Sequence, residues 1–122
     1  MSKWREKYEV HPAADVFPMM TDEELKDLGE DIKKNGLLRC ITIEQRLGVL
    51  IDGRNRLEAM ERAGVELDPE EDIGYVFGED IDAISFVISA NIKRRHLTKQ
   101  QQADLIVAAV KAGITMEEDL PT

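Results

Sequence analysis

The sequence predicts a mixed α/β domain in which a small sheet is flanked by helices. Short, β-branched apolar runs at 40–43, 49–51 and 73–77 are typical of strands in a covered sheet. Segments with the apolar spacing of helices separate these runs. The chain has 122 residues, of which 43% are apolar, and this is enough for one modest core.

The N-terminal part of the chain is predicted to hold a short strand at 8–10 and then a helix. Thr21 and Glu24 form a predicted capping box, because the Thr21 hydroxyl can accept from the Glu24 amide while the Glu24 side chain reaches back. The helix that follows is expected to end at Gly36.

Beyond the second of the apolar strands, a helix over 54–63 is predicted, with Gly64 as its stop. After the strand at 73–77, a buried helix is expected to run from an N-cap at Asp80 to about Asn91.

The last predicted helix begins at a second capping box, at Thr98, and is expected to end at Gly113. A third capping box, at Thr115, is followed by too few residues for a helix. This pattern favours a domain over 1–112, with the start of a following DNA-binding domain at 113–122. A frayed tail is the alternative.

The composition of the chain limits its expected cellular compartment and its expected partners. No apolar run reaches the roughly 18 residues of a membrane span, and the polar N-terminus lacks a secretory signal, so no membrane partner is expected. The single cysteine, Cys40, cannot form an internal disulfide and is expected to be a small buried hydrophobe in a protein of the reducing cytoplasm. The net charge of −9 argues against a broad surface for DNA.

A first basic cluster, Gly53-Arg54-Asn55-Arg56, lies at a predicted strand-to-helix turn. Glycine allows a close backbone approach, and the unpaired amides of a helix start favour an anion, usually a phosphate. Arg54 and Arg56 can each hold two phosphate oxygens, and Asn55 can hydrogen bond beside them. The alternative is an ordinary turn with exposed arginines.

A second basic cluster runs from Asn91 to Thr98, between two predicted helices. Arg94 or Arg95 could reach the same phosphates, or these side chains could merely neutralise a helix C-terminus. Asp52, just before the turn, could ligate a metal or, more commonly, cap the helix that follows.

Together the clusters resemble the N-terminal domain of ParB-type partition proteins, of the ParB/sulfiredoxin superfamily. Gly53 to Arg56 is similar to that family's Gly-x-x-Arg motif, commonly Gly-Glu-Arg-Arg. Ala90 to Arg94 is similar to its second motif, typically Glu-Asn-x-Gln-Arg, and Asn35 to Leu38 looks like its Gly-Leu segment. The resemblance covers about residues 8–112.

This resemblance implies a ParB/sulfiredoxin-like fold and a site for a nucleoside triphosphate, CTP or ATP, with Mg²⁺. The implied phosphate contacts are Gly53, Arg54, Asn55, Arg56, Asn91, Arg94 and Arg95. It also implies a DNA-associated partition or regulatory protein of a plasmid or phage. Such a protein binds DNA through regions outside this chain, and a homodimer is compatible with it. We expect this chain alone to bind duplex DNA weakly.

Departures from the family pattern shape the expected activity. Ala90 replaces the glutamate that ligates Mg²⁺ in the family, so slow or no hydrolysis is expected, and Asn55 replaces an arginine. Arg54 stands where sulfiredoxin has its catalytic cysteine, so sulfiredoxin activity is not expected. An enzyme (a weak NTPase, a nuclease or a small-molecule kinase) and an interaction domain without a ligand remain alternatives. The head of Arg56 is expected to be exposed, so Arg56→Ala should weaken nucleotide binding with little loss of stability.

Overall fold

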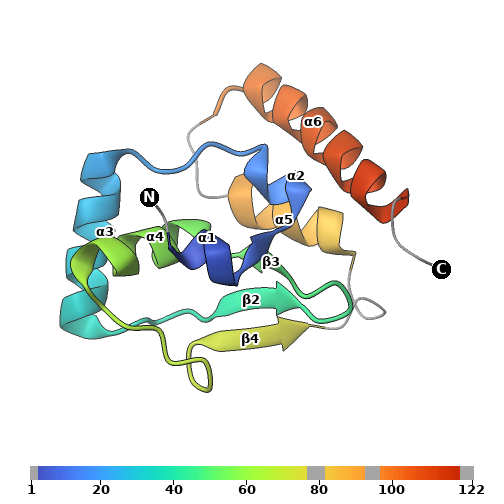
Figure 1. Cartoon of the computed structure of the whole chain (residues 1–122). Coiled ribbons are helices and arrows are strands. Elements are labelled where there is room, and N and C mark those ends of the chain that lie inside the picture. Colours follow the sequence, from blue (N-terminus) through green and yellow to red (C-terminus); the bar gives the residue numbers. More distant parts are fainter. Residues whose placement is uncertain (1–2, 77–81, 93–96, 119–122) are drawn as a thin grey trace.

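The computed structural model describes residues 3–76, 82–92 and 97–118 and shows the expected mixed α/β class (Figure 1). Within these residues it contains one four-stranded sheet and six helices. In chain order the elements are α1 (Trp4–Lys7), β1 (Glu9–Val10), α2 (Pro12–Asp15), α3 (Asp22–Asn35), β2 (Ile41–Glu44), β3 (Val49–Asp52), α4 (Arg54–Ala63), β4 (Ile73–Val76), α5 (Ala83–Ile92) and α6 (Lys99–Glu118).

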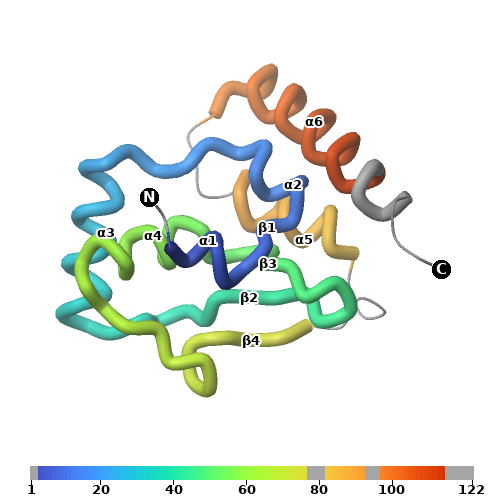
Figure 2. Tube along the Cα trace, viewed as in Figure 1, coloured from blue at the N-terminus to red at the C-terminus, as the bar shows by residue number. Residues whose placement is uncertain are grey.

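The sheet has the strand order β1-β3-β2-β4. The central strands β2 and β3 pair antiparallel, while β1 joins β3 and β4 joins β2 in parallel. Figure 2 traces β1 beside β3 although the two strands lie far apart in the sequence. All four residues of β3 are buried, as expected for a central strand covered on both faces.

Helices cover both faces of the sheet. Because successive side chains of a strand point to opposite faces, Val49 and Ile51 belong to one core and Leu50 to another. The first core includes residues of α2, α5 and α6, and the second includes residues of α1 and α4. The outer helix α3 packs against α4.

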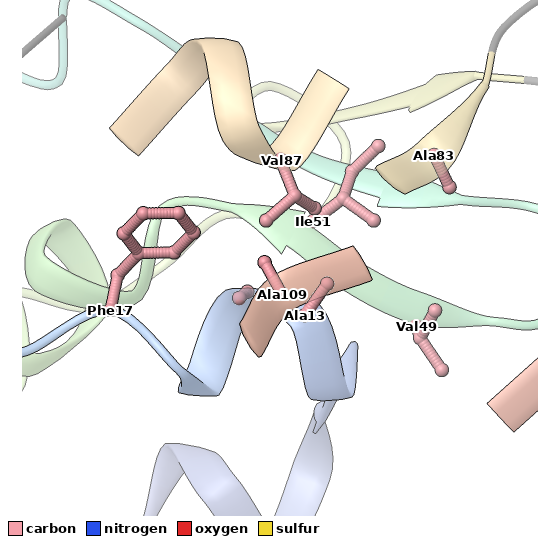
Figure 3. Packing of buried hydrophobic residues seen from close by; sticks show 8 residues of the cluster. Ala13, Phe17, Val49, Ile51, Ala83, Val87 and Ala109 are labelled. Atoms are coloured by element: carbon pink, nitrogen blue, oxygen red, sulfur yellow. The ribbon is translucent and has the colours of Figure 1, made fainter. Parts of the chain in front are cut away.

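The first core combines large side chains from the sheet with small ones from the helices (Figure 3). Val49 and Ile51 of β3 share this core with Phe17, which follows α2, and with Ala13 of α2 and Ala109 of α6. Alanine side chains allow the helix backbones to approach closely, so α6 packs directly on α2.

Two of the three helix starts that were predicted from capping boxes are confirmed. The Thr21 hydroxyl accepts from the Glu24 amide at 3.2 Å, and the Glu24 carboxylate accepts from the Thr21 amide at 3.0 Å. Thr98 and Gln101 make the same reciprocal pair at 3.1 and 2.9 Å. Each box satisfies backbone amides that have no partner within the helix.

The predicted end of the last helix is wrong, because α6 continues through Gly113 to Glu118. A Cβ atom at Gly113 would lie 2.5 Å from Cγ1 of Ile84, so the glycine allows α6 to pass close to α5. Thr115 therefore lies inside α6 and does not begin a new helix.

One further prediction is wrong, and another concerns a residue outside the described part of the chain. Cys40 is exposed, not buried, and its thiol lies 3.6 Å from the carbonyl oxygen of Glu71. The predicted N-cap Asp80 lies outside the described residues, and α5 begins at Ala83 after Asp82, whose carboxylate accepts from the Ile84 amide. No helix among the residues that the structure describes is long and apolar enough to cross a membrane.

Candidate anion site at the start of α4

The turn between β3 and α4 depends on Gly53 for two reasons. Its φ angle of 119° is one that residues with a side chain rarely adopt. A Cβ atom there would also lie 3.0 Å from Cγ1 and Cγ2 of Ile41. The Gly53 carbonyl accepts from the Leu57 amide at 2.9 Å, which closes the first turn of α4.

Arg54 follows this glycine and brings the two predicted clusters into contact. Its Nη2 lies 3.4 Å from Oδ1 of Asn91, and its Nη1 lies 3.4 Å from Oδ1 of Asp15. The Asn91 amide is held in place because its Nδ2 donates to the Val87 carbonyl at 2.8 Å. Its Oδ1 is therefore directed at the start of α4. Thus a residue of each of the two predicted clusters lies at one place in the fold.

The expectation that the head of Arg56 is exposed is wrong. The side chain is only 10% exposed, and its Nη1 donates to the carbonyl oxygens of Arg39 and Cys40, each at 2.7 Å. Its Nη2 pairs with Oδ2 of Asp52 at 2.8 Å. Arg56 therefore ties α4 to the segment before β2 and to the end of β3.

Asp52 has a structural role that differs from both alternatives weighed from the sequence, a helix cap and a metal ligand. The N-cap of α4 is Gly53, and the Asp52 carboxylate, 8% exposed, is paired with Arg56 one helical turn later. Among the described residues, no three His, Cys, Asp or Glu side chains are close enough together to hold a metal ion. Asp52 thus has no companion ligands in that part of the chain.

The other predicted site residues are in part structural and in part outside the described residues. The Asn55 side chain accepts from the Met20 amide at 2.9 Å and so fixes the segment before α3 to the start of α4. Ala90 lies on α5, one residue before Asn91. Arg94 and Arg95 lie outside the described residues.

Two charged residues beside Arg54 were missed by the sequence analysis. Asp15, the last residue of α2, accepts from both Arg5 of α1 and Arg54 of α4. Arg5 also lies over the Trp4 ring, 4.7 Å from its centroid. No local pattern marks this group, because α1 and α2 have only four residues each, too few for an apolar period to show.

Two cavities lie elsewhere on the molecule. One of about 430 Å³ is lined by α1, α4 and the segment after α4, and one of about 500 Å³ lies between α3 and α4. Neither is lined by Gly53, Arg54 or Asn91. The candidate site is a group of charged side chains around a helix start, in which Arg54 is buried and Asp15 is exposed.

Comparison with known proteins gives a viral relative. No protein-family model matches the chain. No solved structure matches it. The chain is 31% identical over 113 residues to the uncharacterized protein ORF326b of Acidianus two-tailed virus. This match covers 84% of the chain but 34% of the viral protein, so the chain spans about a third of the length of that relative.

Proposed function

We propose that this chain is a nucleotide-binding domain of the ParB/sulfiredoxin type, which holds the phosphates of CTP or ATP, with Mg²⁺, at the start of α4. The observation that carries the proposal is the 3.4 Å contact between Arg54 and Asn91. These residues come from the two separate motifs on which the family resemblance rests. Their proximity supports a single site that uses both.

The position of Arg54 also favours a negatively charged ligand. The start of a helix carries a partial positive charge, so an arginine in the first turn favours a nearby anion, and the nearby Asp15 carboxylate is one such anion. A phosphate at this position would accept from the helix amides and from Arg54 together. Arg94 and Arg95 follow Asn91 closely in the sequence and would add charge to the same phosphates.

Distances separate the roles of the two arginines in the first motif. Arg56 donates to two carbonyl oxygens at 2.7 Å each, within the usual range for strong charge-assisted bonds, and forms an ion pair with Asp52 at 2.8 Å. The contacts of Arg54 with Asp15 and Asn91 are longer, at 3.4 Å, so the exchange of these two contacts for phosphate oxygens loses less. We therefore propose Arg54 as a phosphate ligand and Arg56 as the residue that holds the turn in shape.

The protein would act as a regulatory part of a DNA-associated partition protein, with DNA bound by regions outside this chain. The net charge of −9 supports this division, because a surface that grips duplex DNA needs an excess of basic residues.

Calorimetric titration of the purified chain with CTP, ATP and GTP, each with Mg²⁺, tests the proposal. Arg54→Met should weaken binding by about tenfold or more, because a hydrogen bond to a charged group contributes roughly 1.5–3 kcal/mol. Arg46→Ala, an exposed arginine in the turn after β2, is the matched control and should leave affinity unchanged.

Circular dichroism and thermal unfolding of both variants show whether the fold is retained. Phosphate release in the same samples separates a binding domain from an NTPase. If none of the three nucleotides binds at millimolar concentration, the proposed function is wrong.

A further inference from the structure

The Asp15 carboxylate receives two guanidinium groups from different helices. Arg5 approaches it with both terminal nitrogens, at 3.3 Å from Oδ2 and 3.2 Å from Oδ1. Nη1 of Arg54, which belongs to α4, lies 3.4 Å from Oδ1. The Asp15 side chain is 44% exposed, whereas that of Arg54 is 5% exposed. Asp15 therefore lies at the solvent side of a largely buried arginine.

We propose that Asp15 is an internal anion that occupies a phosphate position, and that Arg5 is a further phosphate-binding residue. This inference rests on the proposed function of the same site. In the state without ligand, Asp15 neutralises Arg54 beside the positive start of α4. When a phosphate arrives, it takes the place of the carboxylate between Arg5 and Arg54.

The chemistry of the two anions supports this exchange. Carboxylates and phosphates both accept paired hydrogen bonds from the planar fork of a guanidinium. A phosphate group has more acceptor oxygens than a carboxylate, so it can bridge two arginines while it also accepts from backbone amides.

The geometry of the existing contacts also favours exchange. All three distances between Asp15 and the arginines, 3.2 to 3.4 Å, exceed the 2.7 to 2.9 Å usual for charge-assisted bonds. Asp15 and Arg5 are both well exposed to solvent, and exposed ion pairs are weak because water and salt screen them. Asp15 can thus be displaced at small cost, and it competes directly with the ligand.

Removal of the Asp15 charge should therefore tighten binding. We expect Asp15→Asn to bind Mg²⁺-CTP, or the nucleotide that the wild-type chain prefers, several-fold more tightly than the wild type. The asparagine can still accept from Arg5 but no longer repels phosphate. Arg5→Ala should bind the same ligand several-fold more weakly. Inorganic tripolyphosphate, titrated in parallel, tests whether the phosphates alone account for both effects.

Matched variants separate these effects from a change in net charge. Glu30→Gln removes one exposed carboxylate on α3, and Arg46→Ala removes one exposed arginine. Both controls should change affinity by less than about twofold, because distant exposed charges are largely screened at physiological salt. Thermal unfolding without ligand confirms that each variant is folded.

The outcomes distinguish this inference from the proposed function. If the wild type binds nucleotide but Asp15→Asn binds no more tightly, or Arg5→Ala binds equally well, the inference is wrong and the nucleotide site stands. If no variant binds nucleotide but Asp15→Asn binds tripolyphosphate more tightly than the wild type, the anion site stands and the nucleotide function fails. If no variant binds either ligand, both are wrong.

Discussion

Replacement of Arg56 with alanine should destabilise the domain strongly, although the residue was first expected to be an exposed ligand. Its guanidinium donates to the carbonyl oxygens of Arg39 and Cys40, each at 2.7 Å, and pairs with Asp52 at 2.8 Å. Both charged side chains of this pair are about nine-tenths buried. The alanine variant would leave the Asp52 carboxylate without this partner in a region that water reaches poorly.

The expected loss of stability follows from this geometry. Removal of one partner from a buried ion pair typically costs about 3–5 kcal/mol, because the other charge stays buried. A domain of this kind has a free energy of unfolding of roughly 5–15 kcal/mol, so the loss is a large part of the total. The melting temperature should fall by more than about 10 °C.

Urea denaturation, followed by the fluorescence of the single tryptophan, measures this change. Trp4 is a suitable reporter because it is buried and its indole Nε1 donates to Glu58 of α4 at 2.9 Å. The exposed control Arg46→Ala should change the free energy of unfolding by less than about 0.5 kcal/mol. A double variant, Arg56→Ala with Asp52→Asn, should lose less than the two single variants added together.

An unfolding midpoint of Arg56→Ala equal to that of the wild type would refute this reasoning. It would mean that Arg56 is not held by the three contacts, and the residue would again be a candidate for direct phosphate binding.

Three further predictions concern the turn, the pH dependence and the chemistry of the site. Gly48→Ala should lower the free energy of unfolding by about 1–2 kcal/mol, because the φ angle of Gly48 is 68° and no atom lies within 4 Å of an added Cβ. Gly53→Ala should lower it further, because its added Cβ would also lie 3.0 Å from Ile41, and urea denaturation measures both losses. Burial, and then the nearby Tyr75, raise the pKa of Tyr8 above its ordinary value of 10.0. The folded state therefore favours the protonated phenol, and its contribution to stability, complete below pH 10, is lost as pH rises through the raised pKa. Tyr8→Phe should accordingly lose less stability above pH 10, and an equal loss would contradict the assignment. Phosphate release by the wild type should be slow or absent, and Ala90→Glu should raise its rate if position 90 is that of the family's Mg²⁺ ligand. Brisk Mg²⁺-dependent hydrolysis by the wild type would count against this role of position 90.

Local sequence signals predicted much of the fold. The starts of α3 and α6 are encoded within four residues, at Thr21 and Thr98, where each cap reaches its partner in the next turn. The strand-glycine-helix pattern at Gly53 likewise depends on neighbouring residues, and the turn forms where it was predicted. Such local patterns can be recognised in the sequence without knowledge of the rest of the chain.

Features decided by distant contacts were missed. Gly113 looks like a helix stop in the sequence, and only its approach to Ile84 of α5 shows why α6 continues through it. Two of the Arg56 partners are carbonyl oxygens at Arg39 and Cys40, which no side-chain pattern reveals. The spacing of Asp52 and Arg56, one helical turn apart, was a signal that could have suggested their pairing.

The pairing of the strands has a consequence for the kinetics of folding. Among the strands of the described residues, only β2 and β3 form a local hairpin, whereas β1 pairs with β3, and β4 with β2, across long stretches of chain. The closure of such long loops costs conformational entropy before the strand contacts stabilise the structure, so these pairings tend to form late and to slow folding. The hairpin and the adjoining α4 form the most local unit, and this unit contains the turn at Gly53. The backbone of the candidate site is thus expected to form early. The helices α1, α2 and α5, which carry the side chains around Arg54, are expected to pack against it later.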